Sequence, residues 1–519
     1  MMKKLILVLF CFVINSSAQT LPDIFELGGT SLRKNNDNNP AGNSIEDIVV
    51  VGDTIWLATG NGLSRSIDNG LTWKNYYNSE TFGTEGIARV AYKNGIIYAS
   101  TWHSEELFGR ATPVGTGLKY SVDNGETWTS IPQPKDSVNH TTVTYGITQL
   151  EAIPINVLPD NYIRGLAVTD EAIWIACFGG GVRKSSDRGQ TWQRVVLPPD
   201  NLDSISPSDT LNFRIDGNIN LNHLGQSVTV SQDGTIWVGT SNGINKSTDG
   251  GISWTKITHD NRERSISGDF IIKMRYNDYD NAIWATTWKG KSETEYWSAS
   301  VSFDGGENWQ SFLPGTRPHD FAFLRRGNFA SSETIIVTED GVFRTNNNGN
   351  TWIAAPEIVD NITKVKIVSD DFRSVAVNQN ESGNHIWIGS TNNGLAKITE
   401  TGTEMWNGDW KVFLASEKLS DKGTAKAFPN PFAPSREKIK IQFSTNNSDA
   451  EVSIRIFDFG MNLVKTLLQN APRTSAFDEY FEFWDGRNEN GKVVPNGVYF
   501  YRIDIGNNEP LFGKIMVLN

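Results

Sequence analysis

Short runs of apolar and β-branched residues, bounded by glycine, asparagine and aspartate, recur along most of the chain. One run, apolar and aromatic, leads into a glycine turn, as in TIWLATGNGLSRS. A second β-prone run precedes it, as in IEDIVVV (45–51), and a short run such as TWKNYY follows. Each unit therefore predicts four short strands joined by turns. Copies of the glycine-turn pattern start near Thr54, Gly95, Ala172, Thr235, Ala282, Thr334 and His385, which makes seven units.

An octapeptide of the form S-x-D-x-G-x-[TS]-W lies between the third and fourth predicted strands of six units. Its copies are SIDNGLTW (66–73), SVDNGETW (121–128), SSDRGQTW (185–192), STDGGISW (247–254), SFDGGENW (302–309) and TNNNGNTW (345–352). Their third position holds Asp68, Asp123, Asp187, Asp249, Asp304 and Asn347. An aspartate there accepts backbone hydrogen bonds, the glycine tolerates a positive φ, and the tryptophan offers an apolar plate to the neighbouring sheet. Because Asn347 keeps the acceptor and loses the charge, we interpret the octapeptide as a structural turn, not a catalytic carboxylate.

Four-stranded units repeated roughly every 40–50 residues are typical of a β-propeller, because one such sheet cannot bury both faces alone. The predicted fold class is all-β: a seven-bladed β-propeller followed by a small immunoglobulin-like β-sandwich. The seventh unit lacks the octapeptide, and WKVFL (410–414) is its expected last strand. The sequence leaves open whether residues 21–44 add an edge strand to the ring.

The octapeptide resembles the Asp box, or bacterial neuraminidase repeat, and the I-W-x-G-T-x-x-G-[LI] half resembles the propeller repeat of two-component regulators. Together the two likenesses span residues 45–414. They imply the propeller fold and leave the function open, since Asp-box propellers include enzymes and binding proteins. A sialidase also carries an F-R-I-P motif, whereas the nearest string here is Phe213-Arg214-Ile215-Asp216, which lacks the proline.

The chain changes character after residue 420. Alternating apolar positions, as in VSIRIF and VYFYRI, predict a small sandwich over residues 421–519. FPNPF (428–432), WDG (484–486) and NGVYFY (496–501) are similar to pieces of the C-terminal sorting domain of type IX secretion cargo and of the immunoglobulin-like domain of flagellar hook-capping proteins. This resemblance implies export through the type IX machinery and surface attachment. The alternative is a sandwich that only packs against the propeller.

Residues 1–18 have the pattern of a signal peptide: a basic start, an apolar run over residues 5–14 and small residues before Gln19. The propeller domain is therefore expected over residues 19–420. Removal of the leader leaves Cys177 as the single cysteine, so no intrachain disulfide is expected. We expect an exported monomer, extracellular or on the outer cell surface, with no transmembrane segment in the mature chain.

The net charge of the chain and the motifs that it lacks disfavour several classes of function. A formal net charge of −12 disfavours nucleic acid as a partner, because phosphate binding needs a basic surface. The chain has six histidines and lacks G-x-S-x-G, H-E-x-x-H and phosphate-loop motifs, so neither a metal nor a cofactor is expected.

The predicted strand order places the loops after the second and fourth strands of each unit on the face opposite the octapeptides. We call this side the loop-rich face. Functional residues gather in variable loops on a rigid scaffold, so this face is where a site is expected. All the long insertions fall in these loops: 101–117, 129–161, 194–225, 255–268 and 287–298.

The candidate binding face combines polar residues at the starts of the first strands with aromatic residues of the insertions. Its members are Arg89, Trp102, His103, Arg164, Lys273, Trp288, Trp297, Asp320 and Arg373, joined by Asp47, Phe178, Tyr296 and His319. The favoured function is non-enzymatic binding of a protein or glycan partner, with no catalytic residue assigned. The alternative is a secreted glycoside hydrolase, sialidase-like or xyloglucanase-like, which needs two carboxylates about 5–9.5 Å apart at the channel mouth. A channel mouth that is merely polar and hydrated is the structural alternative.

Overall fold

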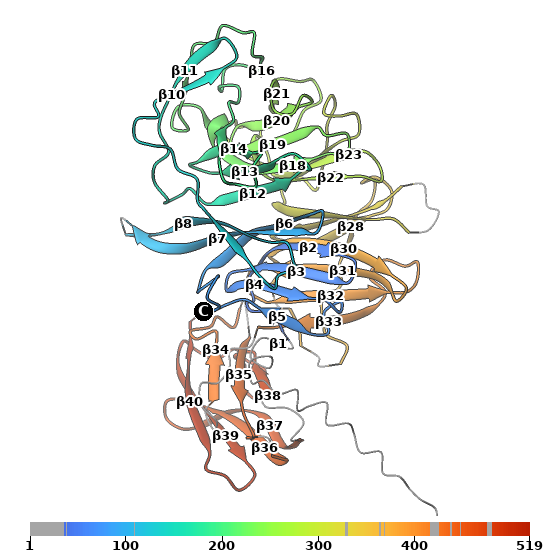
Figure 1. Cartoon of the computed structure of the whole chain (residues 1–519). Helices are drawn as coiled ribbons and strands as arrows, with labels where there is room; N and C mark the ends of the chain where they lie inside the picture. The colour runs from blue at the N-terminus through green and yellow to red at the C-terminus, as the bar shows by residue number, and fades with distance from the viewer. Residues whose placement is uncertain are drawn as a thin grey trace, which may run out of the picture.

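The computed structural model describes residues 36–37, 39–107, 109–326, 331–362, 365–367, 369–415, 425–435, 438–446, 448–474 and 480–518. The predicted leader at residues 1–18 lies outside them. Nearly all of the regular structure in these ranges is β-strand, and a short 3-10 helix, η1 (Leu221–His223), interrupts it (Figure 1). None of the described helical structure is long and apolar enough to cross a membrane.

Up to Ala415, the described strands form consecutive antiparallel four-stranded sheets, here called sheets one to seven. Sheet one contains β2 (Ile45–Val51), β3 (Thr54–Thr59), β4 (Gly62–Ser66) and β5 (Trp73–Asn75), and sheet two contains β6 (Gly86–Lys93), β7 (Ile96–Leu107), β8 (Arg110–Ser121) and β9 (Thr129–Pro132). Sheet three contains β12 (Ile163–Val168), β13 (Ile173–Cys177), β14 (Gly181–Ser185) and β15 (Gln193–Arg194), and sheet four contains β18 (Gly225–Val230), β19 (Ile236–Thr240), β20 (Gly243–Ser247) and β21 (Trp254–Ile257). Sheet five contains β22 (Phe270–Asn277), β23 (Ala282–Trp288), β24 (Ser298–Ser302) and β25 (Gln310–Phe312), and sheet six contains β26 (Pro318–Leu324), β27 (Glu333–Thr338), β28 (Gly341–Thr345) and β29 (Ile353–Ala354). Sheet seven contains β30 (Phe372–Asn380), β31 (Gly383–Ser390), β32 (Leu395–Glu400) and β33 (Asp409–Phe413).

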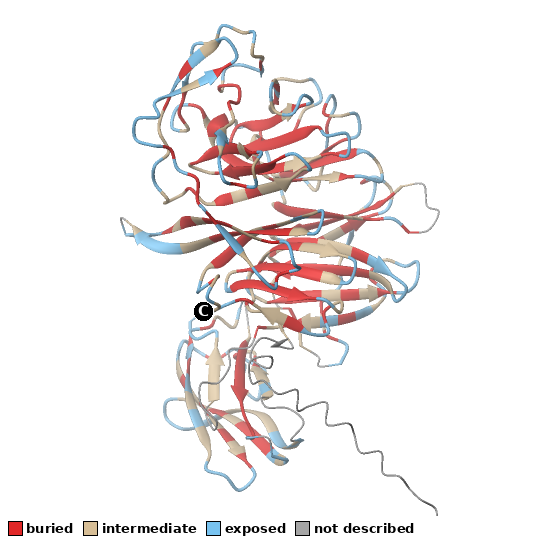
Figure 2. Cartoon of the chain, viewed as in Figure 1, coloured by how far each residue is buried: buried red, intermediate tan, exposed pale blue. Residues whose placement is uncertain are grey.

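The first strands of these sheets contact one another in chain order and close a circle. β2 contacts β6, then β12, β18, β22, β26 and β30 follow in turn, and β30 returns to β2. Apolar side chains fill the spaces between successive sheets, which is why the second and third strands are almost wholly buried (Figure 2). The arrangement is radial, with each sheet packed face to face on the next.

Two short strands extend the outer edges of these sheets. β1 (Asn36–Asp37) pairs with β5, so the N-terminal segment adds an edge strand to sheet one. β16 (Ser204–Ile205) pairs with β21 of sheet four in the same way. The question that the sequence left open is thereby answered for residues 36–37.

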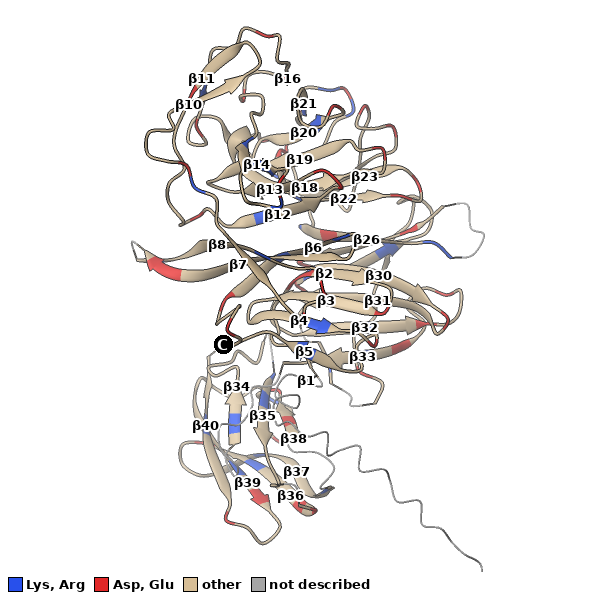
Figure 3. Cartoon of the chain, in the orientation of Figure 1, with Lys and Arg blue, Asp and Glu red and all other residues tan. Residues whose placement is uncertain are grey.

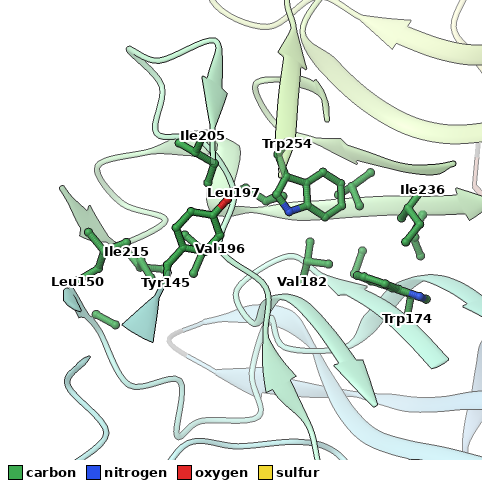
Figure 4. Close-up of a cluster of buried hydrophobic side chains, with 14 of the residues drawn as sticks. Tyr145, Leu150, Trp174, Val182, Val196, Leu197, Ile205, Ile215, Ile236 and Trp254 are labelled. Carbon is green, nitrogen blue, oxygen red and sulfur yellow. The ribbon is translucent and has the colours of Figure 1, made fainter. Parts of the chain in front are cut away.

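The middle parts of the insertions 129–161 and 194–225 fold along the rim, contrary to expectation, whereas residues 158–160 pair with the 101–117 insertion of the loop-rich face. The middle parts form a small sheet of β10 (Thr142–Tyr145), β11 (Thr148–Ala152) and β17 (Arg214–Ile215). Tyr145, Leu150 and Ile215 pack beside Trp254 (Figure 4). The Tyr145 hydroxyl donates to the backbone oxygen of Ile252 in the fourth octapeptide, over 2.6 Å. The insertions fold along the rim because their apolar side chains find a buried surface there.

Each octapeptide forms a turn in which the aspartate or asparagine at the third position accepts local hydrogen bonds. In the first, Asp68 Oδ1 accepts hydrogen bonds from the backbone nitrogens of Leu71 and Thr72 at 3.0 and 2.9 Å, and from Ser66 Oγ at 2.7 Å. Ser66 Oγ accepts from the nitrogen of Gly70, whose φ is +85°. Asn347 reproduces this arrangement, because its Oδ1 accepts from the nitrogen of Thr351 at 3.0 Å.

The tryptophan that ends each octapeptide packs on the preceding sheet. In the octapeptides of sheets one, two, four and six, its ring partner is the aromatic residue near the start of the preceding sheet's second strand. Edge-to-face pairs are Trp128 on Trp56, Trp254 on Trp174 and Trp352 on Trp284, with ring centroids 6.0, 6.5 and 6.4 Å apart. These contacts add ring-ring attraction to the burial of large apolar surfaces.

A cation from the third strand covers the same aromatic ring and reaches the next turn. Lys184 Nζ lies 4.9 Å from the ring centroid of Trp174 and donates to the backbone oxygen of Gly250 at 3.1 Å. Lys246 does the same over Trp237, with the oxygen of Gly305 as acceptor at 2.7 Å. Sheets three and four therefore each hold the octapeptide of the next sheet by stacking and by a charge-assisted hydrogen bond.

The interface between sheets six and seven is built differently. Ile335 occupies the tryptophan position of sheet six, and sheet seven has no octapeptide. Arg344 instead lies over Trp406 at 5.1 Å and donates to Glu400 at 2.8 and 3.1 Å, and its Nε donates to Glu333 at 2.6 Å. A buried ion cluster thus replaces the aromatic contact.

The C-terminal strands form two sheets around a core of their own. One contains β34 (Ala425–Phe428), β35 (Ile439–Phe443) and β38 (Tyr480–Trp484), and the other contains β37 (Leu463–Arg473), β36 (Ala450–Phe457), β39 (Gly497–Ile505) and β40 (Leu511–Val517). Ile441, Ile454, Trp484 and Tyr501 belong to one buried cluster that both sheets supply. The region is therefore a β-sandwich with an independent core.

Candidate binding face

Every first strand has a bulge at the same position. The pairing with the second strand shifts register just after the residues Ile45, Ile87, Ile163, Gly225, Ile271, Pro318 and Phe372. Bulges re-aim neighbouring side chains and are common beside functional sites. The residues that the pairing passes over include Arg164, Lys273, His319 and Arg373, while Asp47, Arg89 and Asp320 come directly after the shift. Seven of the predicted residues therefore lie at these bulges.

Lys273 and Asp320 join Asp47 and Arg275 in one ion cluster. Asp47 Oδ1 lies 3.0 Å from Lys273 Nζ and 3.1 Å from Arg275 Nη2, and Arg275 Nε lies 2.9 Å from Asp320 Oδ1. Burial raises the pKa of Asp47, but the charges of Lys273, Arg275 and Arg89 outweigh it and lower this pKa to about 2. Burial and the Arg275 charge lower the pKa of Lys273 to about 8. The sequence analysis missed Arg275, because its position inside a β-strand gives no sign of its partners.

Asp47 and Asp320 are the carboxylates to compare with the acid–base pair of a hydrolase, because both bind Arg275. Both bind the same nitrogen of Arg275, at 3.1 and 3.0 Å, so these oxygens are no more than about 6 Å apart. Their exposed fractions are only 2% and 1%. A general acid must hold a proton near neutral pH, and an Asp47 with a pKa of about 2 does not. This pair is a structural ion cluster.

Trp102 and Arg164 belong to a stack that bridges sheets two and three. Trp102 lies against Tyr162, with ring centroids 5.9 Å apart. The Arg164 guanidinium carbon is 5.0 Å from the ring of Tyr162 and 4.8 Å from that of Phe178. His103 lies beside this stack, where the hydrogen bond to Glu105 raises its pKa. Among the described residues, the Trp102 indole nitrogen and Arg164 Nε have no hydrogen-bond partner.

Trp288 and Trp297 form a second group through Arg317. The Arg317 guanidinium carbon lies 5.7 Å from the Trp288 ring and 4.4 Å from the Trp297 ring. Trp288 also packs edge to face on His319 at 5.4 Å. Trp288 pairs with Phe270 as Trp102 pairs with Gly86, each at the start of a first strand. The two tryptophans therefore occupy equivalent positions in sheets two and five.

Arg373 lies at the edge of this second group. Its Nη2 is 3.2 Å from Asp371 Oδ2, and Nε donates to Thr391 Oγ1 at 2.9 Å. Asp371 Oδ1 is 3.6 Å from His319 Nε2. Burial, together with the Arg373 charge, lowers the pKa of His319 to about 4, so this imidazole is neutral at pH 7.

Asp269 is a titratable group on the loop-rich face that the sequence analysis did not identify. It precedes Phe270, which stacks on Trp288 with centroids 6.4 Å apart. Burial raises the pKa of Asp269 to about 6, and the nearby Glu295 charge adds to the rise. Glu295 itself is occupied by the backbone nitrogens of its own loop, including those of Lys291 and Ser292. Asp269 is thus a carboxyl group that exchanges its proton near neutral pH.

No protein-family model matches the chain. The sequence is 23% identical over 285 residues to xyloglucanase Xgh74A of Acetivibrio thermocellus, which covers 50% of this chain and 30% of that protein. The chain thus spans about a third of the length of the curated relatives it matches.

Solved structures resemble the chain in fold. An ancestral GH74 enzyme aligns over 92% of this chain and 62% of its own, with a TM-score of 0.53 and 13% identity. The GH74 enzyme of Niastella koreensis aligns over 93% and 74%, with a TM-score of 0.50 and 15% identity. With the radial order of the sheets, these likenesses define the class of the protein as a β-propeller.

Proposed function

We propose that the chain is an exported, monomeric propeller that binds a glycan through the loop-rich face. Sheets one to seven are its seven blades, and the octapeptides are Asp boxes in a purely structural role. The C-terminal sandwich is immunoglobulin-like and acts as a type IX sorting domain that leads the protein to the cell surface. Support comes from the closed circle of first strands and from the separate core of the sandwich.

The observation that carries the binding proposal is the pair of aromatic–arginine groups around Trp102 and Trp288. Aromatic faces stack on the apolar faces of sugar rings, and convergent polar groups orient the hydroxyls. The indole nitrogen of Trp102 and Nε of Arg164 lie beside the first stack, buried and without a hydrogen-bond partner among the described residues. The likeness to a xyloglucanase favours a glycan over a protein as the partner.

Titration calorimetry with xyloglucan oligosaccharides tests this proposal. We expect binding that Trp102→Ala and Trp288→Ala each weaken by about tenfold, the loss of one stacking contact. Leu71→Ala, an exposed position in the first octapeptide, is the matched control and should leave the affinity unchanged. Unchanged affinity in both tryptophan variants, or no binding to any member of a glycan array, contradicts the proposal.

A glycoside hydrolase is the second candidate, and Asp269 is the observation that favours it. A carboxyl group with a pKa of about 6 is suited to donate a proton to a leaving oxygen. The assay is release of reducing ends from xyloglucan. Activity that falls as the pH rises through about 6 and disappears in Asp269→Asn supports the hydrolase. No release by the native chain excludes it and leaves the binding proposal standing.

A further inference from the structure

A cleft of about 930 Å³ lies on the rim, between sheets two and three. Strand β9 and the segment that follows it line one side, including Gln133, Asp136 and His140. Arg183 and Arg194 line the other side, together with the third octapeptide. The cleft is therefore beside the octapeptides and separate from the stacks of Trp102 and Trp288. Its volume suits a small organic ligand or a few sugar rings.

The cleft is basic, although the protein is acidic. Acidic and basic residues are interspersed over the loops (Figure 3), and the formal net charge is −12. The cleft lining nevertheless contains Lys135, Arg183, Arg188 and Arg194 against a single carboxylate, Asp136. Such a local excess of positive charge attracts anions and disfavours cations.

Two buried guanidinium groups share that single carboxylate. Arg183 Nη1 lies 2.8 Å from Asp136 Oδ1, and Arg194 Nη1 lies 3.5 Å from Asp136 Oδ2. The side chains of the arginines are only 4% and 7% exposed. Burial and the Arg183 charge lower the pKa of Arg194 to about 10, although Asp136 opposes the shift. The Asp216 charge also opposes this shift, but within the cleft lining the two guanidinium groups face one carboxylate, in a desolvated place where charges are normally paired.

Arg183 also keeps one edge of its guanidinium without a partner. Nη1 binds Asp136, but Nε and Nη2 are buried and have no hydrogen-bond partner among the described residues. The fully buried Arg344 is different, because all three of its nitrogens donate to Glu333 or Glu400. The Nε–Nη2 edge is the planar fork that arginine uses to bind a carboxylate with two parallel hydrogen bonds.

We propose that this cleft binds an organic carboxylate, and that the carboxylate is that of a uronic acid in an acidic glycan. The Arg183 fork takes the carboxylate, and Arg194 adds positive charge beside it. The remaining lining supplies groups suited to a sugar: the amides of Gln133 and Gln190 for hydroxyls and Trp192 for a ring face. This site does not rest on the function proposed for the loop-rich face.

The probe is trigalacturonate, with cellotriose as its neutral counterpart, in titration calorimetry on the full mature chain. We expect trigalacturonate to bind and cellotriose not to bind. Arg183→Lys keeps the charge that Asp136 needs, and it removes the fork. It should weaken binding at least tenfold, with thermal unfolding as the check that the variant is folded. Arg188→Gln, an exposed cation of the same lining, should weaken binding no more than threefold.

Three results overturn the proposal: no binding of trigalacturonate to the folded chain, equal binding of cellotriose, or unchanged binding in Arg183→Lys. Acetyl-triglycine with a free carboxylate serves as the peptide arm. If it binds and trigalacturonate does not, the carboxylate comes from a peptide and the uronic acid assignment is wrong. Trp102→Ala and Trp288→Ala should leave trigalacturonate binding unchanged, so failure at this cleft and failure at the loop-rich face are distinguishable.

Discussion

Lys397 donates a hydrogen bond from Nζ to the backbone oxygen of Asn69, over 2.9 Å, and so joins the seventh sheet to the first. Lys397 also covers the Trp387 ring at 4.9 Å, and Trp387 in turn packs edge to face on Trp73, with centroids 6.3 Å apart. The ring is therefore closed by the same contact that joins neighbouring sheets elsewhere. Closure needs no strand from a distant part of the chain.

Gly70→Ala should disrupt the packing between sheet seven and sheet one. A Cβ at Gly70 would lie 2.5 Å from Cη2 of Trp387, and its φ of +85° disfavours any side chain. We expect a loss of about 3 kcal/mol in the free energy of unfolding, measured with urea. Gly234→Ala is the control, because its φ is +84° with open space around it, and it should cost only about 1 kcal/mol. Equal losses in the two variants would mean that the contact with Trp387 is unimportant.

Substitutions of Asp68 distinguish the stability that its hydrogen-bond acceptor contributes from the stability that its negative charge contributes. Asp68→Asn keeps Oδ1 for the nitrogens of Leu71 and Thr72, as Asn347 does for Thr351, and loses only the strengthening of these hydrogen bonds by the charge, so it should cost less than about 1 kcal/mol. Asp68→Ala removes the acceptor and should cost about 1–2 kcal/mol. Urea unfolding measures both. A large loss in Asp68→Asn would show that the turn depends on the negative charge.

Acid should weaken the octapeptide turns. The hydrogen bond from Thr191 lowers the pKa of Asp187 to about 2. Burial raises the pKa of Asp304, but the hydrogen bonds that it accepts outweigh burial and lower this pKa to about 2 as well. Both lie below the usual pKa of about 3.9 for aspartate, so the unfolded chain binds more protons in this range. The stabilisation is complete above pH 4 and is lost as the pH falls from about 4 to 2.

Thermal unfolding followed by circular dichroism at pH 5, 4, 3 and 2 measures this loss. Asp187→Asn combined with Asp304→Asn removes two of the titrating groups, so its unfolding midpoint should fall less steeply with acid. A slope equal to that of the native chain would place the acid sensitivity elsewhere.

Arg275→Met should destabilise the central ion cluster. Among the described ion pairs, Asp320 would keep only that with Lys273, at 3.9 Å, and Asp47 would lose one of the three cations that lower its pKa. Removing one partner of a buried ion pair leaves an uncompensated charge, and we expect a loss of about 3 kcal/mol in urea unfolding. Arg373→Met is the matched control, because Asp371 is partly solvated and the change should cost less than about 1 kcal/mol.

The repeating part of the fold was predictable because its causes are local. The residues of the octapeptide make its turn among themselves. Glycine turns likewise end strands such as the one that begins at Thr54. The bulges were not predictable, because residues such as Arg164 and Lys273 fit a regular strand equally well. Sequence likewise could not show that Tyr145 reaches Ile252, since a loop's course over the surface depends on which apolar partners fold beneath it. The Arg183 fork stayed hidden for the same reason: an unpaired edge is a property of its neighbours.

The contact between sheets has a practical consequence for repeat exchange. Where Ile335 replaces the tryptophan, the octapeptide that would have packed on it is missing as well, so the two halves of that interface are altered together. A cassette cut at the sheet boundaries would separate Trp174 from Trp254 and leave both halves unmatched. A transplantable cassette should instead run from the second strand of one sheet through the octapeptide of the next. Shuffled rings built from such offset cassettes should assemble where whole-sheet exchanges fail.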